Sequence, residues 1–236
     1  MSIKNFLNKL IYPNYCTSDA YVKFLRKGGA KIGEGTFFYG PKLHPVDETS
    51  LPYVEIGRNC RITSGVTILA HDYSYAVLRP IYHCMLCKAG VTKIGDNVFI
   101  GINSIITMGV EVGNNVIIGA GSVVTKNVPS NVVVAGNPAK VVCTLEEYYE
   151  KCNERFDTYA KIVYVRKKKN LGRELREDDM GWYVALWNSE KRYDIVSKMR
   201  VDGDNPEKVY KDVVDFPARY KSYEQFQNIV QRKDNR

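Results

Sequence analysis

One of the three histidines in the chain, His71, has a position that suits catalysis. A regular repeat runs up to His71 and slips out of frame directly after it, so residues 72–91 are expected to leave the repeat as a loop. Loops of this length inside compact domains are usually functional. A neutral imidazole can take a proton from a hydroxyl near pH 7, because the ordinary pKa of histidine lies close to that value. His71 is therefore a candidate general base, although a lone histidine is more often a structural or surface residue.

Two lysines, Lys126 and Lys140, are candidates for binding an anion. They occupy the only basic positions late in the repeat, and an ammonium group on a fixed surface suits phosphate groups. The alternative for each lysine is a solvated residue at a turn. Glycine-rich turns in the same region can also supply backbone N–H donors to an oxyanion.

A metal centre is not expected. His83, Cys84 and Cys87 resemble half of a zinc site, but no second CxxC or histidine pair completes it. The six cysteines are scattered and no secretory leader is recognisable, so reduced thiols in a cytoplasmic protein are the simplest account. Cys60 falls in a small inward position of the repeat and is predicted to lie in the core.

The elements that must position these residues come from a six-residue repeat. From residue 94 the chain reads IGDNVF, IGINSI, ITMGVE, VGNNVI, IGAGSV and VTKNVP, in one frame to Pro129. An aliphatic residue opens each hexad, and a small or β-branched residue fills its fifth place. A helix would scatter aliphatic residues of this period around its axis, and a hairpin sheet alternates with period two. The period predicts a three-sided parallel β-helix, with three hexads per coil and the opening residues pointing inward.

The same frame extends upstream and divides the chain. Residues 1–30 are predicted to be an N-terminal helical segment, with a short helix capped by Thr17 or Ser18 and stopped at Gly28. The β-helix spans residues 31–142, and its prolines at 41–53 suggest a coil with an outward bulge. Residues 143–236 are predicted to be a helical extension of unknown role that begins at a capping box, Thr144 to Glu147. Its expected packing residues are Trp182, Trp187, Tyr193, Val209 and Tyr220.

The composition of the chain limits the classes of binding partner that we expect. Hydrophobic residues make up 44% of the chain, and no apolar run approaches the roughly 20 residues that a membrane span needs, so no integral membrane segment is expected. The net charge of +8 is spread along the chain. Basic and aromatic residues are not interleaved as in RNA-binding proteins, so no nucleic acid is expected, and an anionic small molecule is the better match for the charge.

The hexads, the lone His71 before a loop, and the closing IGAGSVVTKNVP and VVVAGNPAKVV segments together resemble the hexapeptide-repeat acyltransferases, which fold as a left-handed parallel β-helix. The nearest likeness is to sugar O-acetyltransferases of the maltose and galactoside type and to capsular or exopolysaccharide O-acetyltransferases. It covers about residues 20–155, and the GAGSVVTK and GNPAK pair is highly specific. The left hand comes from this resemblance alone, since the usual crossover rule predicts the opposite hand.

The resemblance implies an acetyl-CoA-dependent O-acetyltransferase with His71 as its base, working as a homotrimer that binds acetyl-CoA between two subunits. Matched position by position, it implies the cofactor-binding residues Ile102, Ala120, Thr125, Lys126 and Lys140. A trimer also suits the outward apolar residues at sixth positions of the hexads, Phe99, Ile105 and Ile117. The chain departs from the pattern twice. Residues 36–40 hold no asparagine to match one that helps hold the acceptor, and Cys143 replaces a frequent basic residue.

The acceptor stays open at this point. A hydroxyl of a sugar, nucleotide sugar or polysaccharide precursor is favoured. A drug of the streptogramin or chloramphenicol kind and the amine of an amino sugar are alternatives, and a non-catalytic scaffold is a remote one. A carbonic anhydrase of the gamma type needs three histidines converging on zinc, which the spacing of His44, His71 and His83 does not suit. The sequence does not show what orients His71. Asp72 adjoins it, but adjacent residues on a strand point opposite ways.

Overall fold

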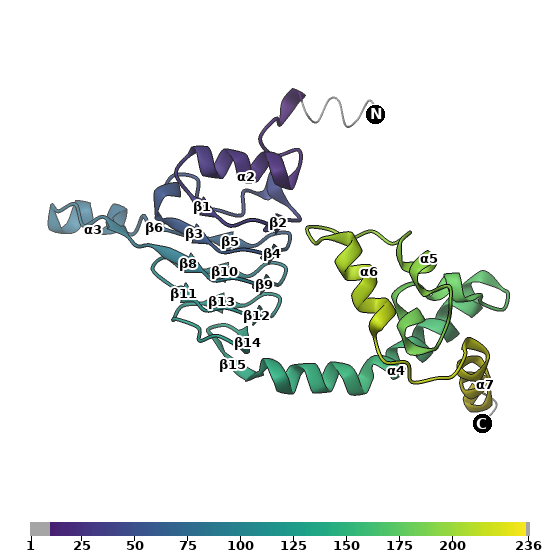
Figure 1. The fold of residues 1–236 in the computed structure, drawn as a ribbon. Coiled ribbons are helices and arrows are strands. Elements are labelled where there is room, and N and C mark those ends of the chain that lie inside the picture. Colours follow the sequence, from purple (N-terminus) through teal and green to yellow (C-terminus); the bar gives the residue numbers. More distant parts are fainter. Residues whose placement is uncertain (1–9, 235–236) are drawn as a thin grey trace. The chain divides into compact units, whose positions relative to one another are not determined.

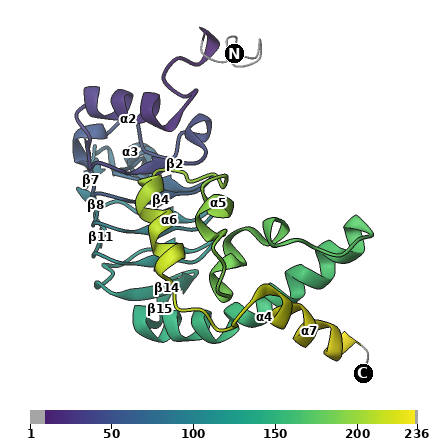
Figure 2. The ribbon, with the colours of Figure 1, turned by 45° about the vertical axis from the view of Figure 1, so that its right-hand side comes forward.

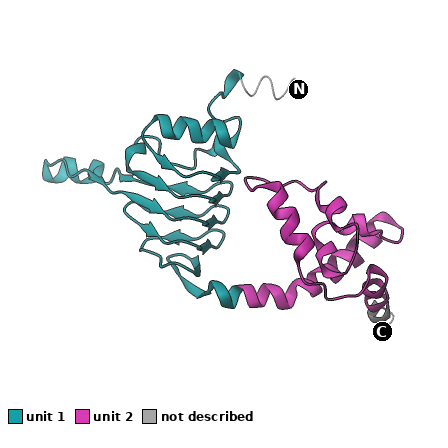
Figure 3. Cartoon of the chain, in the orientation of Figure 1, with its two compact units in different colours: residues 1–148 teal, residues 149–236 magenta. Residues whose placement is uncertain are grey.

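The computed structural model describes residues 10–234 and divides into two compact units, residues 1–148 and residues 149–236 (Figure 3). Residues 1–9 of the predicted N-terminal helical segment lie outside the described residues. The first unit contains the hexapeptide repeat. The second is helical, and each has a hydrophobic core of its own.

The first unit is built from three parallel sheets of very short strands, here called sheets A, B and C (Figure 1). Sheet A consists of β1 (Lys31–Ile32), β3 (Val54–Ile56), β8 (Thr92–Ile94) and β11 (Glu111–Val112). Sheet B consists of β2 (Phe37–Phe38), β4 (Arg61–Ile62), β9 (Phe99–Ile100), β12 (Ile117–Ile118), β14 (Val132–Gly136) and β15 (Ala139–Thr144), with only β15 antiparallel. Sheet C consists of β5 (Thr67–Ile68), β10 (Ile105–Ile106) and β13 (Val123–Val124). The chain visits the sheets in turn, which is the parallel β architecture expected from the repeat.

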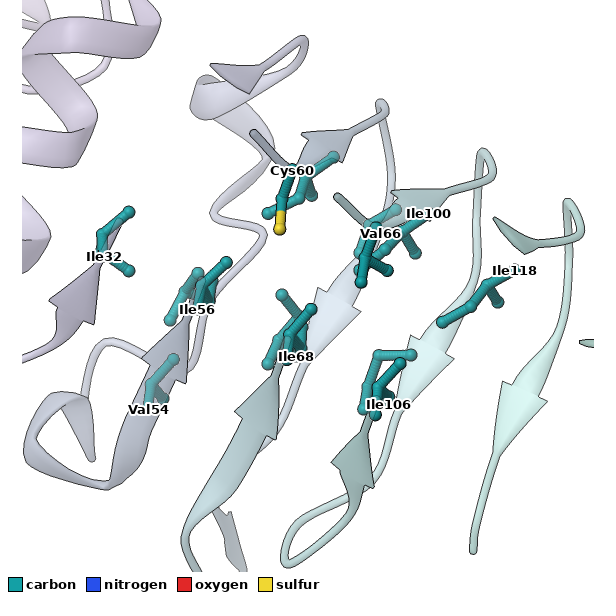
Figure 4. Packing of buried hydrophobic residues seen from close by; sticks show 14 of the residues in the cluster. Ile32, Val54, Ile56, Cys60, Val66, Ile68, Ile100, Ile106 and Ile118 are labelled. Atoms are coloured by element: carbon teal, nitrogen blue, oxygen red, sulfur yellow. The ribbon is translucent and has the colours of Figure 1, made fainter. Parts of the chain in front are cut away.

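The opening residues of the hexads stack in register. Ile94 pairs with Val112, 18 residues further along the chain. Ile56 pairs with Ile94, 38 residues away, because the loop 72–91 intervenes between them. Openers and fifth-place residues both point inward, as Ile100, Ile106 and Ile118 do in Figure 4, and the openers of the six hexads from residue 94 are at most 3% exposed. Cys60 is fully buried, as predicted.

The outward sixth positions differ between the sheets. On sheet A they alternate in charge, with Lys31 paired to Glu55 and Glu55 to Lys93. On sheet B, Phe99 lies beside Ile117. Ile105 belongs to sheet C, so the expectation of one apolar stripe through Phe99, Ile105 and Ile117 is wrong. The sixth residues of three successive hexads lie on three different sheets, because each hexad forms one side of the coil.

The corners of the repeat are held by residues in the left-handed backbone region. Asn97, Asn115 and Asn131 have φ values of 56°, 56° and 63°, a conformation that asparagine tolerates better than most side chains. Their side chains form a ladder, because the Asn97 amide donates to Asn115 and the Asn115 amide donates to Asn131, each at 2.9 Å. The ladder links the corners of successive coils through their side chains.

The predicted N-terminal helix is confirmed as α2 (Ser18–Lys27), which lies over one end of the stacked strands (Figure 2). The Thr17 hydroxyl accepts a hydrogen bond from the Ala20 N–H at 3.1 Å, and the helix ends at Gly28. Tyr21 and Leu25 are fully buried in the core of the first unit. The 41–53 segment contains two short 3-10 turns, η1 (Pro41–Leu43) and η2 (Leu51–Tyr53).

The loop 72–91 leaves the repeat at His71, as predicted. It begins with β6 (His71–Asp72), contains α3 (Tyr75–Tyr82), and returns through β7 (Lys88–Ala89), which pairs antiparallel with β6. Figure 1 shows α3 projecting away from the sheets. No residue of α3 is buried.

The predicted capping box opens α4 (Leu145–Leu171). The Thr144 N–H donates to Glu147 at 2.9 Å and the Glu147 N–H donates to the Thr144 hydroxyl at 3.1 Å. The second unit continues with η3 (Glu177–Leu186), α5 (Arg192–Val196), α6 (Pro206–Asp215) and α7 (Tyr223–Asp234). Trp187 is fully buried in its core, whereas Tyr193 is 46% exposed and packs against the Tyr210 ring from outside that core. Among the described residues, no helix is both long and apolar enough to cross a membrane.

Candidate active site

His71 lies where the chain leaves sheet C. Its ring is about one third exposed, and its Nδ1 contacts the Asp47 carboxylate in a very short hydrogen bond. The Thr49 hydroxyl lies 3.3 Å from the same nitrogen. Among the described residues, no hydrogen-bond partner is found for Nε2. One nitrogen of the imidazole is therefore held by the protein, and the other has no partner among the described residues.

The Asp47 carboxylate is itself firmly held. Its side chain is 5% exposed, and it accepts hydrogen bonds from the Thr49 hydroxyl at 2.6 Å and from the Ala70 N–H at 3.2 Å. Burial by itself would raise the pKa of Asp47. The hydrogen bonds from Thr49, His71 and Ala70 outweigh burial and hold the pKa of this carboxyl below its ordinary value. Asp47 is thus a carboxylate throughout the pH range in which a histidine titrates.

This pairing sets the tautomer of His71. A carboxylate only accepts hydrogen bonds, so Nδ1 must carry the proton that lies between His71 and Asp47. In the neutral ring Nε2 then has a free lone pair. A neutral imidazole in this tautomer can accept a proton from a hydroxyl, and the nearby carboxylate stabilises the cation that results.

The other candidates around His71 have different partners. Asp72 accepts a hydrogen bond from the Ser74 N–H and lies 3.7 Å from the Lys88 ammonium, so it does not orient the imidazole. His44 lies 3.0 Å from Glu48, and His83 ends α3. Within residues 10–234, no three His, Cys, Asp or Glu side chains are placed to hold a metal ion together.

The cofactor residues implied by the motif lie at two corners of the repeat. Corner BC denotes the turns from sheet B to sheet C, and corner CA the turns from sheet C to sheet A. Ile102 and Ala120 lie at corner BC on neighbouring coils, where the Gly121 N–H donates to the Ile102 carbonyl at 2.8 Å. A Cβ on Gly101 would lie only 2.5 Å from the Ala120 nitrogen, so this close stacking requires glycine. Lys140 pairs with Ala135 in the β14–β15 hairpin, next to the same corner.

Thr125 and Lys126 lie at corner CA, the corner that also carries His71. The Thr107 N–H donates to the Val124 carbonyl, and the Leu69 N–H donates to the Ile106 carbonyl, which places Thr125 two coils from Leu69. With strands about 4.8 Å apart, this separation is roughly 10 Å along the axis. The proposed site residues therefore border both edges of sheet C.

The lysines fit a phosphorylated ligand. Lys126 and Lys140 are exposed, and neither has an acidic partner among the described residues. Ile102, Ala120 and Thr125 are exposed as well. Two unpaired ammonium groups beside exposed backbone suit the phosphates and the extended arm of a coenzyme A thioester.

Sequence reasoning missed Asp47 and Thr49. Both lie in the 41–53 segment, where the hexad pattern breaks, so their orientation could not be derived from the repeat. The one sequence signal that could have indicated Asp47 is its position as an acidic residue in a segment that keeps the six-residue count. The bridge between Val46 and Ile68 aligns this segment with β5, three residues before His71.

Comparison with known proteins places this architecture. The family described as the hexapeptide repeat of succinyl-transferase matches residues 91–126. Protein CapG of Staphylococcus aureus is 42% identical over 158 residues, which cover 65% of this chain and 88% of that protein. YvoF of Bacillus subtilis (strain 168), named as an acetyltransferase, is 35% identical over 132 residues, covering 56% and 68%. A serine O-acetyltransferase structure from Brucella melitensis is 31% identical, with a TM-score of 0.36, and the match covers 49% of this chain and 39% of that one.

The chain belongs to the hexapeptide-repeat acyltransferase family, since it covers more than two thirds of two relatives at these identities. It is accordingly an acyltransferase. The family implies that the parallel sheets form a left-handed β-helix, and its members use acetyl-CoA.

Proposed function

We propose that this chain is an acetyl-CoA-dependent O-acetyltransferase that acetylates a hydroxyl of a sugar or a polysaccharide precursor, with His71 as the general base. The observation that carries the proposal is the pairing of His71 Nδ1 with Asp47, which in the neutral ring leaves the Nε2 lone pair without a partner among the described residues. The likeness of the closing repeat to sugar O-acetyltransferases supports the acceptor class. Three hexads form each coil, in keeping with the 18-residue register of Ile94 and Val112.

The proposed reaction gives one role to each group of the site. A thioester is an activated acyl donor, so the reaction needs a base to remove the proton of the acceptor hydroxyl. His71 accepts that proton at Nε2, and Asp47 stabilises the imidazolium through Nδ1. Backbone N–H groups of the glycine-rich turns stabilise the negative charge on the thioester carbonyl oxygen in the tetrahedral intermediate. The intermediate then breaks its C–S bond to give the acetyl ester and CoA thiolate, and the imidazolium returns its proton to that sulfur.

A CoA-release assay over a panel of sugars, nucleotide sugars, amino sugars and chloramphenicol tests this function. We expect release of CoA with a sugar or nucleotide-sugar hydroxyl. Acetylation of chloramphenicol alone would instead make the protein a drug acetyltransferase, and acetylation of an amino group would make it an N-acetyltransferase. No release with any donor and acceptor would contradict the proposal.

Lys126 and Lys140 are proposed to bind the phosphates of the donor. Replacing either with alanine should raise KM for acetyl-CoA by about 10- to 100-fold, since a hydrogen bond to a charged group contributes about 1.5–3 kcal/mol. The value of kcat should change little, because a contact far from the thioester serves ground and transition states alike. Lys93→Ala on sheet A is the matched control. An unchanged KM for acetyl-CoA in both variants would show that other groups bind the phosphates.

We propose a homotrimer. The proposed donor-binding residues lie at corners BC and CA, and in a trimer acetyl-CoA would bind between such corners of two neighbouring copies. The interface is assigned to sheets B and C, where Phe99 and Ile117 and, separately, Ile105 and Val123 lie side by side facing outward. Sheet A is excluded by its alternating charges. Light scattering should give the mass of three chains. Phe99→Glu should reduce it, because a charge would be buried in the contact, whereas Glu111→Gln on sheet A should not. A monomeric wild type would contradict the assembly.

A further inference from the structure

The turn that carries Asp47 is held on its other side by a cluster of polar groups that the reaction does not use. Glu48 follows Asp47 directly, and its carboxylate accepts hydrogen bonds from the Tyr15 hydroxyl at 2.9 Å and from the Tyr21 hydroxyl at 3.2 Å. His44 Nδ1 lies 3.0 Å from the same carboxylate. The cluster lies beside the proposed active site, but none of its hydrogen bonds involves His71.

The side chains of successive residues in this turn contact different partners. Asp47 and Thr49 contact His71, while Glu48, between them, contacts tyrosines of the N-terminal segment. The Ser50 N–H donates to the Asp47 carbonyl at 3.3 Å and closes a turn over residues 47–50, so a contact that fixes Glu48 within this turn also constrains its two neighbours. The orientation of Glu48 thus bears directly on the orientation of Asp47 and Thr49.

The anchor for Glu48 is rigid. Tyr21 lies in α2, is fully buried, and accepts a hydrogen bond from the Val46 N–H at 3.3 Å. Burial above all, and then the charge of Glu48, raise the pKa of Tyr21 above its ordinary value, so its hydroxyl stays protonated and donates. The Tyr15 ring packs against the Tyr21 ring at 5.6 Å and against the His44 ring at 4.5 Å. Glu48 is therefore held by donors that are fixed by packing.

The other support of the turn is the backbone. The Asp47 N–H donates to the Ile68 carbonyl, and the Ile68 N–H donates to the Pro45 carbonyl, each at 2.8 Å. Beyond Asp47 the backbone bond of the turn is the longer one from the Ser50 N–H, and the side-chain contacts of Glu48 and Thr49 hold the turn in addition to it. The Thr49 N–H and hydroxyl both donate hydrogen bonds to the Asp47 carboxylate.

We propose that Glu48 is a positioning residue of the acyl-transfer reaction. Anchored by the Tyr15 and Tyr21 hydroxyls, it holds the turn so that the Asp47 carboxylate and the Thr49 hydroxyl stay on Nδ1 of His71. The N-terminal helix then serves catalysis as well as covering the core, because its Tyr21 connects to the base through Glu48 and Asp47. The inference rests on the proposed function of His71 as the base.

Glu48→Gln is the primary test. A carboxamide has one acceptor oxygen where the three donors use two, so the turn should loosen. We expect kcat to fall by about 10- to 100-fold, which is the usual effect of a small displacement of a catalytic group, with KM for acetyl-CoA within about twofold of wild type. Tyr15→Phe, which removes one donor from a half-buried position, should lower kcat less. Tyr53→Phe is the matched control, since its exposed hydroxyl lies in the same 41–53 segment with no hydrogen-bond partner among the described residues.

The ring nitrogens of His71 give a readout that needs no turnover. In uniformly 15N-histidine-labelled full-length protein, His71→Gln assigns the resonances of that ring. Wild type should show one neutral tautomer with the proton on Nδ1, and Glu48→Gln should show a mixture of both tautomers. This measurement tests the positioning role even if His71→Ala were to retain activity, in which case the proposed function alone would fail.

A double-mutant cycle separates positioning from general stabilisation. If Glu48 acts through Asp47, Glu48→Gln should cause no further loss of kcat in an Asp47→Ala background. An equal loss in both backgrounds would overturn the proposal. So would a Glu48→Gln protein that keeps a single His71 tautomer and a kcat within twofold of wild type while melting at a lower temperature, because Glu48 would then only stabilise the fold.

Discussion

Replacing His71 with alanine should lower kcat by about 10²- to 10⁴-fold, the range over which a general base contributes to rate. The alanine variant lacks the proposed base, whose Nε2 has no partner among the described residues of the wild type. KM for acetyl-CoA and the proposed trimeric mass should stay close to wild type, because residues other than His71 are proposed to bind the donor. Steady-state kinetics of CoA release measure both constants.

Two features of this experiment make it decisive. His83→Ala is the matched control, because that histidine lies in the same loop and ends α3 without contacting Asp47. In wild type, kcat/KM should fall as the pH is lowered, since the base works only in its neutral form. Residual activity within about threefold of wild type in His71→Ala would mean that the base lies elsewhere.

Replacing Asp47 with asparagine should lower kcat by about 10²- to 10³-fold, nearly as much as loss of the imidazole. An asparagine carboxamide can donate to Nδ1, which would place the proton of the neutral ring on Nε2, and a protonated Nε2 cannot accept from the substrate. Asp47→Ala should be milder, because the ring then samples both tautomers. The predicted order of kcat is therefore wild type, then alanine, then asparagine.

The pH dependence adds a second check on Asp47. Hydrogen bonds from Thr49, His71 and Ala70 outweigh the effect of burial and hold the pKa of Asp47 below its ordinary value, so the carboxylate remains charged while the imidazole gains its proton. Removing that charge leaves the imidazolium that forms during the reaction without a counter-ion, so kcat/KM should be lowered across the whole pH profile in Asp47→Ala. Asp72→Asn, which alters the neighbour of His71 without touching its ring, should leave the profile in place. An Asp47→Asn enzyme as active as wild type would remove Asp47 from the reaction.

Much of the fold follows from the sequence because the repeat is local and redundant. Each hexad states the same rule, an aliphatic opener with a small fifth residue, so the inward positions of Ile100, Ile106 and Ile118 could be predicted without knowing their neighbours. The helix caps at Thr17 and Thr144 are also local signals, since the capping side chain lies within three residues of the N–H that it bonds. The break after His71 marked the residue at which the chain leaves the sheets.

The tertiary structure decided what the repeat does not encode. Asp47 reaches His71 from 24 residues earlier in the chain, through a coil in which the hexad pattern fails, so no sequence rule connects the two. The prediction that the outward apolar residues form one stripe was wrong for a related reason. Phe99, Ile105 and Ile117 occupy the same hexad position, but their sheets depend on how the coils close around the axis. Inward positions depend on local pattern, whereas the partners of a side chain depend on which coils lie side by side, and insertions such as residues 72–91 change that spacing.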